Sequence, residues 1–558
     1  MSTLELFAPK WEDLWQGTDT HEPVGAVFTR PEIVDLILDL AGYSAMEVRL
    51  STRSILEPSC GDGAFLEAIL KRLVDSERVH ADPIDWNDST LDSAIRAVDI
   101  NAGSVEKARA LIVSKLTHAG CPGARSASLA DGWLVHADFL LKEWDHKFSF
   151  VVGNPPYVRL EDLPKAVLNH YRRAFSTATD RADLYVAFIE RGLQLLATEG
   201  VLAFICANRF AKNQYGAALR KLIAQRFHVR HFLNLEHTQP FLQEVSAYPA
   251  IVVLDRQRGE PTNAASLPDL SDETLEAVRR GISCPGKPGK LVSIFSEWYQ
   301  DGSPWRTTSL AEHQFLASLE ERFPHLETSA PGTKVGIGVA TGADPVFVLD
   351  GKHPTIEESR QIPLLMSQDV RVDSLSWSKH FLVNPFSDTD DGSLISLAEF
   401  PGLGDYLEGS SDRLKNRHVA KTRPATWFRT IDRIWPKLQF VPKLVLPDIQ
   451  PGGVVGLDPG NYYPHHNLYW ITSDSWDLRA LQALLRSTYV LVQVRAFSVQ
   501  MRGGSLRYQA QTLRRLRLPS LATLSPASLS KLASVATSKE QDQIDKAASE
   551  AFGIAIPT

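Results

Sequence analysis

The sequence predicts an α/β fold, with a Rossmann-like, mostly parallel sheet covered by helices on both faces and a C-terminal α+β domain. Three observations support this prediction. Apolar strands alternate with amphipathic helices over residues 31–255, a pattern typical of parallel sheets buried on both faces. A Gly-rich turn joins the first of these strands to the next helix. The chain has 558 residues, more than the roughly 250–300 that one core accommodates.

Hydrophobic periodicity predicts the elements of the first half in order. A helix is expected over residues 31–43, a strand at 54–58 and a second helix at 65–74, and a later helix covers 183–197. Further strands are expected at AIRAVDI (94–100), WLVHADF (133–139), FSFVVG (148–153), VLAFICA (201–207) and YPAIVVL (248–254).

Changes in composition along the chain predict five segments. Residues 1–24 form an N-terminal extension and 25–255 the first domain. The polar, Pro- and Gly-containing residues 256–292 are expected to be a linker. Short strands, aromatic residues and loops fill 293–519, the expected α+β domain, and 520–558 are a segment of one or two amphipathic helices.

The charge is unevenly distributed. The net charge is −7, from 59 Lys and Arg against 66 Asp and Glu, so the chain as a whole does not have the balance of a nucleic-acid binder. Locally, residues 411–450 hold nine Lys or Arg against three Asp, and residues 491–520 hold six Arg and no acid. These two stretches are the candidates for contacts with phosphates.

Several classes of protein are disfavoured. The sequence shows neither a signal peptide nor a run of the roughly 20 apolar residues that a membrane span needs, so we expect a cytoplasmic protein without a membrane partner. The four cysteines lack the paired spacing of zinc sites or disulfide frameworks, and no metal site is expected. They are Cys60, Cys121, Cys206 and Cys284.

Polar side chains follow the first strands at their carboxyl ends, where the ligands of open α/β sheets bind. Gly61 and Gly63 allow a tight turn into a helix N-terminus, which suits an anionic or carboxylate-bearing ligand; a turn without a ligand is the alternative. Asp99 ends the second strand and is placed to bind ribose hydroxyls, unless it caps the helix that begins near Ser104.

The third and fourth strand ends carry two further motifs. Asp138 can accept a hydrogen bond from an exocyclic amino group while Phe139 stacks on a base. The fourth strand ends in Asn-Pro-Pro-Tyr, residues 154–157. A turn needs only a proline, so the amide and the aromatic ring call for a separate explanation.

The order of these motifs resembles that of a known family. The motifs GAVFTRP (25–31), LEPSCGDG (56–63), VDI (98–100), ADF (137–139) and NPPY (154–157) fall in the order seen in N6-adenine DNA methyltransferases. A Thr-Pro motif first and a recognition region last resembles the gamma class of restriction–modification systems. The resemblance implies a seven-stranded sheet, S-adenosylmethionine as cofactor and a bacterial or archaeal cell.

The resemblance also implies which residues hold the cofactor. Thr29 would bind its methionine end, although it could instead be a helix N-cap. Glu57, Pro58 and the turn at Cys60 and Gly61 would bind its amino acid moiety, although Cys60 could be simply a small buried residue. The ribose would be bound by Asp99, and the adenine by Asp138 and Phe139.

The Asn-Pro-Pro-Tyr motif explains how an adenine amino group can be methylated. The lone pair of the adenine amino nitrogen is delocalised into the ring. A site that accepts hydrogen bonds from both N–H groups would favour a pyramidal nitrogen and expose this lone pair. The Asn154 side-chain oxygen and the Pro155 carbonyl are the expected acceptors, held still by Pro155 and Pro156. A flipped-out base would stack on Tyr157. Phe241 is expected on its opposite face, with Tyr248 as a competing candidate and a core role for Phe241 as the alternative.

The second half favours duplex DNA as the partner. Residues 335–349, 423–429 and 502–519 resemble parts of the target-recognition region of the class. Arg502 and Arg507 are expected to contact phosphates and grooves, together with Arg514, Arg515 and Arg517, although a solvated face is the alternative.

Other functions stay open at this point. An RNA-adenine or protein-glutamine N-methyltransferase, or a catalytically silent DNA-binding defence component, would share parts of this pattern. Cytosine N4 is disfavoured because Ser more often replaces Asn in those enzymes. Only about 24 residues precede the Thr-Pro motif, so any cognate restriction endonuclease is expected to be a separate chain.

Overall fold

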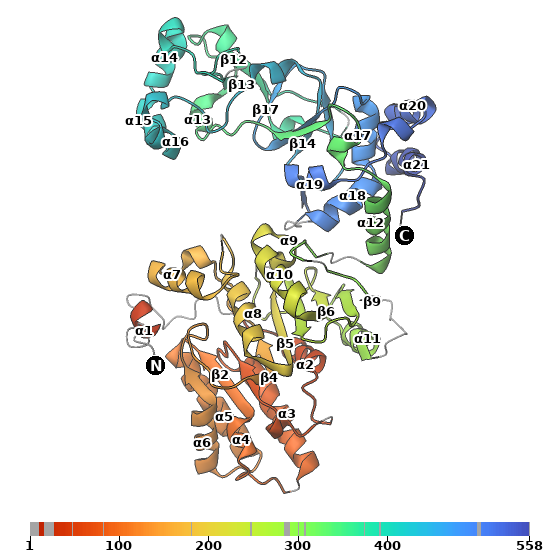
Figure 1. Ribbon diagram of the computed structural model, residues 1–558. Coiled ribbons are helices and arrows are strands. Elements are labelled where there is room, and N and C mark those ends of the chain that lie inside the picture. Colours follow the sequence, from red (N-terminus) through yellow and green to blue (C-terminus); the bar gives the residue numbers. More distant parts are fainter. Residues whose placement is uncertain are drawn as a thin grey trace. The chain divides into compact units, whose positions relative to one another are not determined.

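The structure of the chain is a computed structural model. It describes residues 11–15, 27–46, 48–81, 83–179, 181–245, 248–283, 291–299, 301–305, 309–372, 374–389, 392–498 and 504–556. The chain divides into two compact units, Met1–Leu310 and Ala311–Thr558 (Figure 1).

The first unit is built on one nine-stranded sheet within the described residues. Its strand order is β3-β2-β1-β4-β5-β7-β6-β8-β9. The strands from β3 to β5 pair in parallel, whereas β7 is antiparallel to both of its neighbours. The first seven are β1 (Ile55–Glu57), β2 (Ile95–Asp99), β3 (Leu134–His136), β4 (Phe148–Gly153), β5 (Leu196–Ala207), β6 (His228–Asn234) and β7 (Pro249–Asp255). The mostly parallel α/β fold expected from the sequence is present.

Helices cover both faces of this sheet and form two hydrophobic cores with it. Alternate residues of the central strands enter different cores: Phe150 and Val152 of β4 face one, and Val151 faces the other. The first core takes α2 (Pro31–Ala41), α3 (Ala64–His80), α4 (Thr90–Ala94), α5 (Ala102–His118) and α6 (Gly123–Trp133). The second takes α7 (Lys165–Ala174), α8 (Leu184–Leu195), α9 (Arg209–Lys212) and α10 (Ala217–Arg226). A short helix, α1 (Trp11–Leu14), precedes them.

The structure corrects the expected strand count and the expected linker. Residues 256–292 hold β8 (Thr262–Ser266), α11 (Asp272–Ser283) and the start of β9 (Val292–Phe295), so they extend the sheet from seven strands to nine. The strand β8 is made of small and polar residues. A polar composition therefore does not identify a linker in this part of the chain. The unit boundary falls at Leu310 instead of near residue 255.

The strand β6 is also absent from the sequence-based prediction, because two histidines interrupt its apolar pattern. Both His228 and His231 are buried. Burial lowers the pKa of His231 to about 3, so its imidazole is neutral at ordinary pH and is compatible with a strand interior.

Within its described residues, the second unit contains two four-stranded sheets. One has the order β10-β18-β14-β16 and the other β11-β13-β12-β17. Their strands are β10 (Lys334–Ile337), β11 (Val348–Asp350), β12 (Gln361–Leu365), β13 (His380–Val383), β14 (Lys443–Pro447), β16 (Gly456–Asp458), β17 (Tyr463–Pro464) and β18 (Leu468–Thr472). A two-stranded ladder joins β15 (Ile449–Gln450) to β19 (Leu506–Arg507).

Helices of the second unit pack in two groups. The short α13 (Asp344–Phe347) and α14 (Pro401–Glu408) share a core with the β12 sheet, with α15 (Ser411–Lys415) and α16 (His418–Thr422) following in the chain. The other core unites α12 (Leu310–Arg322), α17 (Leu478–Arg486), α18 (Thr488–Phe497), α19 (Ala510–Arg515), α20 (Pro526–Val535) and α21 (Gln541–Phe552). The predicted C-terminal helices therefore belong to this unit. Across the described ranges, every helix is too short or too polar to cross a membrane.

Candidate active site

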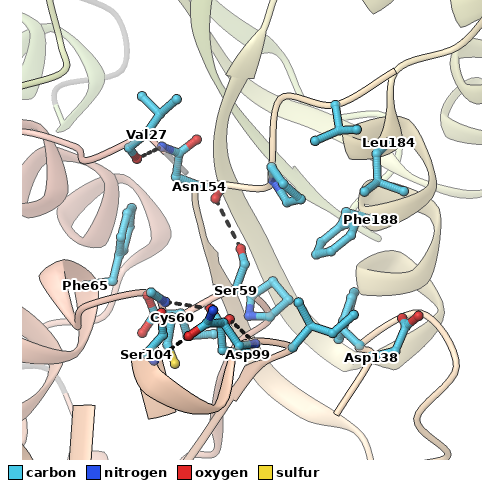
Figure 2. Close-up of a pocket in the computed structure, with 18 of the residues that line it drawn as sticks. Val27, Ser59, Cys60, Phe65, Asp99, Ser104, Asp138, Asn154, Leu184 and Phe188 are labelled. Atoms are coloured by element: carbon cyan, nitrogen blue, oxygen red, sulfur yellow. Dashed lines mark hydrogen bonds between the residues drawn. The ribbon is translucent and has the colours of Figure 1, made fainter. Parts of the chain in front are cut away.

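A pocket opens at the carboxyl ends of β1 to β4 (Figure 2). Its empty volume is about 1190 Å³, including the part open to solvent, which is large enough for a nucleoside-sized ligand. The residues that the sequence predicts at the strand ends converge on it. Thr29, Glu57, Pro58, Cys60, Gly61, Asp99, Asp138, Phe139, Asn154 and Pro156 all line this pocket.

Asp99 lines the pocket and accepts two backbone hydrogen bonds. The N–H groups of Gly61 and Asn101 donate to its two carboxylate oxygens, each at 2.8 Å. Each oxygen keeps a further lone pair for a ligand hydroxyl. Asn101, and not Asp99, caps α5 by accepting from the Ser104 N–H at 2.8 Å. The helix-cap alternative for Asp99 is therefore wrong.

The end of β1 carries a buried carboxyl, Glu57, which interacts electrostatically with Asp99 and precedes a tight turn. Gly63 has a φ of +95°, and a Cβ there would lie 2.6 Å from the Leu111 side chain, so glycine is required. Glu57 is 2% exposed, and its Oε2 atom has no hydrogen-bond partner among the described residues. Burial, with a contribution from Asp99, raises the pKa of Glu57 well above its usual range. Cys60 is buried.

Asp138 is held by three donors at the next strand end. Its Oδ2 atom accepts from the Trp15 indole at 3.0 Å and from the Tyr171 hydroxyl at 2.6 Å, and its Oδ1 atom accepts from the Leu140 N–H at 2.9 Å. Burial raises the pKa of Asp138. The neighbouring Phe139 packs against Phe188 with ring centroids 5.1 Å apart.

The two ends of the Asn154 side-chain amide differ in their hydrogen bonding. Its Nδ2 atom donates to the Val27 carbonyl at 2.8 Å and to the Thr29 hydroxyl at 3.2 Å. Because a carbonyl only accepts, this contact fixes which end of the amide is nitrogen. The Oδ1 atom is buried and has no partner within the described ranges. The backbone carbonyl of Asn154 accepts from the Ser59 hydroxyl at 3.1 Å.

The segment that orients Asn154 is itself held by a distant part of the chain. The Arg30 N–H donates to the Pro240 carbonyl at 3.0 Å, and the Leu242 N–H donates to the Phe28 carbonyl at 2.9 Å. Thr29 lies opposite Phe241 in this bridge. Since the N-cap of α2 is Arg30, without a side-chain cap bond, Thr29 is not the helix cap that was the alternative.

Tyr157 and Phe241 contact each other. Their ring centroids are 5.8 Å apart and the rings meet edge to face at 79°. Phe241 is 2% exposed and belongs to the first core, as in the core alternative. The Tyr157 hydroxyl is buried and has no partner in the described part of the chain. Neither ring lines the pocket, and neither does Pro155, so their predicted roles at a substrate base stay predictions.

Similarity to known proteins decides the family. The family model "Eco57I restriction-modification methylase" matches residues 93–241. The type II methyltransferase M.XhoI of Xanthomonas vasicola is 41% identical over 95% of this chain and 97% of its own length. M.PaeR7I of Pseudomonas aeruginosa is 41% identical over 96% of this chain and 92% of its own length. The chain belongs to the type II methyltransferases of restriction–modification systems.

The fold of this type II methyltransferase also has a solved counterpart. The structure of the type IIL restriction–modification enzyme MmeI in complex with DNA matches 100% of this chain and 75% of its own chain, with a TM-score of 0.62. At 13% identity this likeness shows the fold alone. The family assignment predicted from the order of the motifs is confirmed.

The pocket of the methyltransferase fits S-adenosylmethionine, the cofactor of its class. The buried Glu57 Oε2 atom has no partner among the described residues, and the cationic amino group of the cofactor would satisfy it. The carboxylate of Asp99 has lone pairs for ribose hydroxyls. Phe139 supplies a face for an aromatic base. Which atom of the cofactor each residue binds stays a prediction.

The arginines predicted to contact DNA mostly bind the protein itself. Arg507 forms an ion pair with Asp448 at 2.5 Å. Arg514 donates to the Val335 carbonyl at 2.6 Å, and Arg517 donates to the Phe323 carbonyl at 3.1 Å. These bonds indicate that the arginine-rich segment contributes to the folded structure of the second unit. The prediction for Arg507 stays untested, and Arg502 lies outside the described residues.

The sequence-based prediction does not name Trp15, Tyr171 and Val27, which hydrogen-bond to predicted site residues. Trp15 and Tyr171 bind Asp138 from positions 123 and 33 residues away, and Val27 holds Asn154 through its backbone carbonyl. Val27 lies inside the quoted motif GAVFTRP, so that motif was a signal for it. Trp15 and Tyr171 lie in segments without any motif, and only the tertiary fold brings them to the pocket.

Proposed function

We propose that this methyltransferase transfers the methyl group of S-adenosylmethionine to N6 of an adenine that is flipped out of duplex DNA. The observation that carries the proposal is the Asn154 amide, whose nitrogen is held by Val27 and Thr29 while its buried oxygen has no partner. An oxygen in this position accepts from an amino group and cannot rotate away.

The residues of the chain act by positioning. The bound cofactor supplies a methyl group on a sulfonium ion. Asn154 Oδ1 accepts one N–H of the target amino group, and the Pro155 carbonyl accepts the other, which favours a pyramidal nitrogen with an exposed lone pair. An amide is not a base at ordinary pH, so the proton of the product leaves after the methyl transfer.

Adenine must leave the duplex before it can reach this site, at a cost of a few kcal/mol. Tyr157 is the proposed stacking surface. Phe241 is the proposed surface for the opposite face of the base, and a base between the two rings has to separate them, because they now contact each other. Stacking on an aromatic side chain contributes roughly 1–3 kcal/mol per base and offsets part of the cost of flipping.

The second unit carries the proposed DNA-contact surface. Residues 431–441 expose four large apolar side chains, which we call the apolar strip: Ile431 (52%), Trp435 (45%), Phe440 (68%) and Val441 (39%). The Arg433 guanidinium lies 3.5 Å from the centroid of the Trp435 ring. Exposed basic residues precede the strip in the chain, among them Lys421 and Arg423. Cations for phosphates and apolar groups for base steps suit a DNA duplex.

We further propose that methylation protects DNA from a cognate restriction endonuclease on a separate chain. The support is the family itself, since the relatives M.XhoI and M.PaeR7I are named as type II methyltransferases.

The experiment that tests the proposal uses plasmid DNA without N6-methyladenine, purified protein and S-adenosylmethionine carrying a labelled methyl group. Digestion to nucleosides and mass spectrometry should show N6-methyladenine as the labelled product. Asn154→Ala is the control for a contaminating activity and should give on the order of 10²–10³ times less labelled product. Labelled N4-methylcytosine, or label in RNA or protein with none in DNA, would overturn the proposal.

A further inference from the structure

Three side chains of metal-ligating types meet in the second unit, whereas the pocket described above belongs to the first. They are Asp344, His465 and His466, and one donor atom from each lies within 4.8 Å of the other two. The Asp344 Oδ2 atom is 3.2 Å from His465 Nε2. The two imidazole rings are adjacent, with centroids 4.0 Å apart.

Hydrogen bonding accounts for only part of this cluster. The contact with Asp344 satisfies one nitrogen of His465, which is 2% exposed. The Nδ1 atoms of both His465 and His466 are buried and have no partner among the described residues. Buried polar atoms without partners are rare in folded proteins. A metal ion beside the Asp344 carboxylate would bind one nitrogen of each ring, which for His465 is Nε2.

The backbone holds these residues in place. The His466 N–H donates to the Val339 carbonyl and the Val339 N–H to the Pro464 carbonyl, each at 3.0 Å. Asp344 also accepts from the Thr341 hydroxyl. The loop 338–344 is thus joined to residues 464–466 both by its backbone and by the cluster.

We propose that Asp344, His465 and His466 bind a divalent transition-metal ion, with Zn²⁺ as the ion that fits them best. Two imidazoles and one carboxylate are a common zinc ligand set, whereas Mg²⁺ and Ca²⁺ prefer oxygen ligands. A tetrahedral zinc ion with bonds of about 2.0 Å places its ligands roughly 3.3 Å apart. The 3.2 Å between Asp344 Oδ2 and His465 Nε2 matches this value, and the ligand atom of the half-buried His466 lies within 4.8 Å of both.

The ion would cross-link the loop 338–344 to residues 464–466. Sequence spacing does not reveal such a site, because Asp344 and His465 are 121 residues apart. This inference does not rest on the proposed function, and its test needs neither DNA nor methyl transfer.

The test uses the full chain without an affinity tag, stripped with EDTA and dialysed. We expect about one Zn²⁺ per chain by mass spectrometry after reloading, and a rise in Tm when Zn²⁺ is in excess. Competition with a chromogenic chelator gives the affinity. Visible absorption of the Co²⁺-loaded protein reports the coordination geometry.

The variants His466→Ala and Asp344→Asn should each weaken Zn²⁺ binding at least tenfold and change the Co²⁺ spectrum. His418→Ala removes an exposed histidine of the same unit and should leave both unchanged. Circular dichroism confirms that each variant is folded before titration. Sub-stoichiometric zinc in the wild-type protein, or equal affinities in the wild type and in Asp344→Asn, would overturn the proposal.

Discussion

At the scale of single residues, Asn154 illustrates how a side chain can be prepared for an absent partner. Its nitrogen is occupied by Val27 and Thr29, and its oxygen is buried without a partner in the described part of the chain. Leaving a buried acceptor unpaired costs about 1–3 kcal/mol. The fold tolerates this cost at a position where a substrate can satisfy the acceptor.

The first prediction concerns this acceptor. Asn154→Ala should lower kcat by a factor on the order of 10²–10³, the usual effect of removing one preorganised hydrogen-bonding group, while the Kd for S-adenosylmethionine measured by calorimetry stays unchanged. Asn154→Asp keeps acceptor oxygens but loses the donor to Val27, and so separates the two roles. Asn87→Ala, at an exposed site of the same unit, is the control. Near-normal turnover in Asn154→Ala would refute the acceptor role.

The second prediction follows from the raised pKa of Glu57. Because its folded-state pKa lies above the unfolded value, the stability that this group contributes is present at low pH and is lost as the pH rises through the folded pKa. A cationic amino group at Glu57 would favour the carboxylate and release a proton. Affinity for S-adenosylmethionine should therefore rise from acid toward neutral pH.

Calorimetry in two buffers of different ionisation enthalpy measures this proton release. We expect up to about one proton per bound cofactor in the wild-type protein and less in Glu57→Gln. Binding without proton release in either protein would show that Glu57 does not face the cationic group.

The residue scale also shows what the sequence could predict. Asp99 ends β2, and Asp138 and Asn154 follow β3 and β4, so each is recognisable from its place at a strand end, whereas Glu57 is identified only through the family resemblance. Trp15 reaches Asp138 across 123 residues, and no local pattern encodes such a contact. The same holds for Asp344 with His465.

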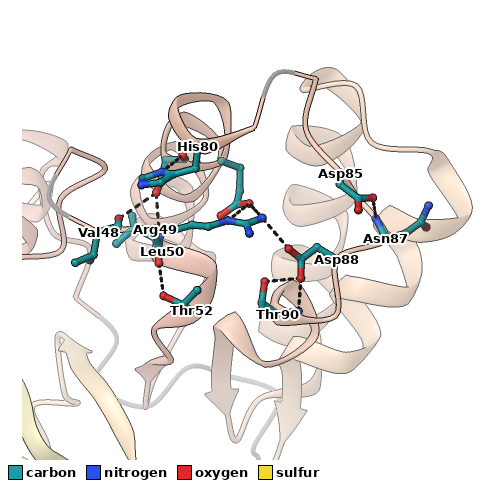
Figure 3. A network of polar contacts seen from close by, with 11 residues as sticks. Val48, Arg49, Leu50, Thr52, His80, Asp85, Asn87, Asp88 and Thr90 are labelled. Carbon is teal, nitrogen blue, oxygen red and sulfur yellow. Dashed lines mark hydrogen bonds and ion pairs between the residues drawn. The ribbon is translucent and has the colours of Figure 1, made fainter.

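At the scale of elements, a charged network joins α3 to the segment before α4 (Figure 3). Arg49 donates to Glu77 at 2.6 Å and pairs with Asp88 at 2.7 Å. The Glu77 side chain is 1% exposed and that of Arg49 is 28% exposed. Hydrogen bonding to Glu77 raises the pKa of Arg49. The guanidinium of Arg49 thus compensates the charge of the buried Glu77 carboxylate in α3.

The third prediction is that Arg49→Met destabilises the first unit by about 3 kcal/mol, because a buried charge without its partner is costly. The double variant Arg49→Met, Glu77→Leu should recover part of this loss. Urea unfolding followed by tryptophan fluorescence measures the free energy, with Arg109→Met as control because the Arg109–Asp131 pair is more exposed. If Arg49→Met and the control Arg109→Met unfolded at the same urea concentration, the Arg49–Glu77 network would contribute no stability.

Elements with strong apolar patterns were predictable, and those with mixed patterns were not. The strands β4 and β7 and residues 201–207 of β5 are almost wholly apolar, and the sequence locates them. The strand β6 contains histidines that only burial neutralises, and β8 is stabilised by its place beside β6. Prolines and glycines around α11 suggested a linker, although they only border the helix.

At the scale of the whole molecule, catalysis and recognition are proposed to occupy different units. The pocket lies in Met1–Leu310 and the apolar strip in Ala311–Thr558. The boundary at Leu310 was not predictable, because β8 and β9 resemble loop sequence and continue the first sheet. A division of labour of this kind means that variants in one unit should leave the other function intact.

The fourth prediction tests this division. Trp435→Ala should weaken binding to duplex DNA about tenfold, since one aromatic contact is worth roughly 1–3 kcal/mol. The Kd for S-adenosylmethionine should not change. The salt dependence of DNA binding should also stay the same, because no charge is removed. Fluorescence anisotropy at several salt concentrations measures both quantities.

Val79→Ala, which shortens an exposed apolar side chain of α3 in the first unit, is the control. Lys421→Ala should instead reduce the slope of the logarithm of affinity against the logarithm of salt concentration. Wild-type DNA affinity in Trp435→Ala would exclude the apolar strip from the DNA contact.

The bridge between Thr29 and Phe241 has a consequence for how the protein folds. The orientation of Asn154 depends on residues 27–29, which pair with a segment more than 200 residues later in the chain. Contacts between such distant segments form late, because a long loop must close first. Nascent or partly refolded chains can therefore possess the sheet while lacking a competent acceptor, and catalytic activity should be the last property to return after denaturation and the first to be lost in mild urea.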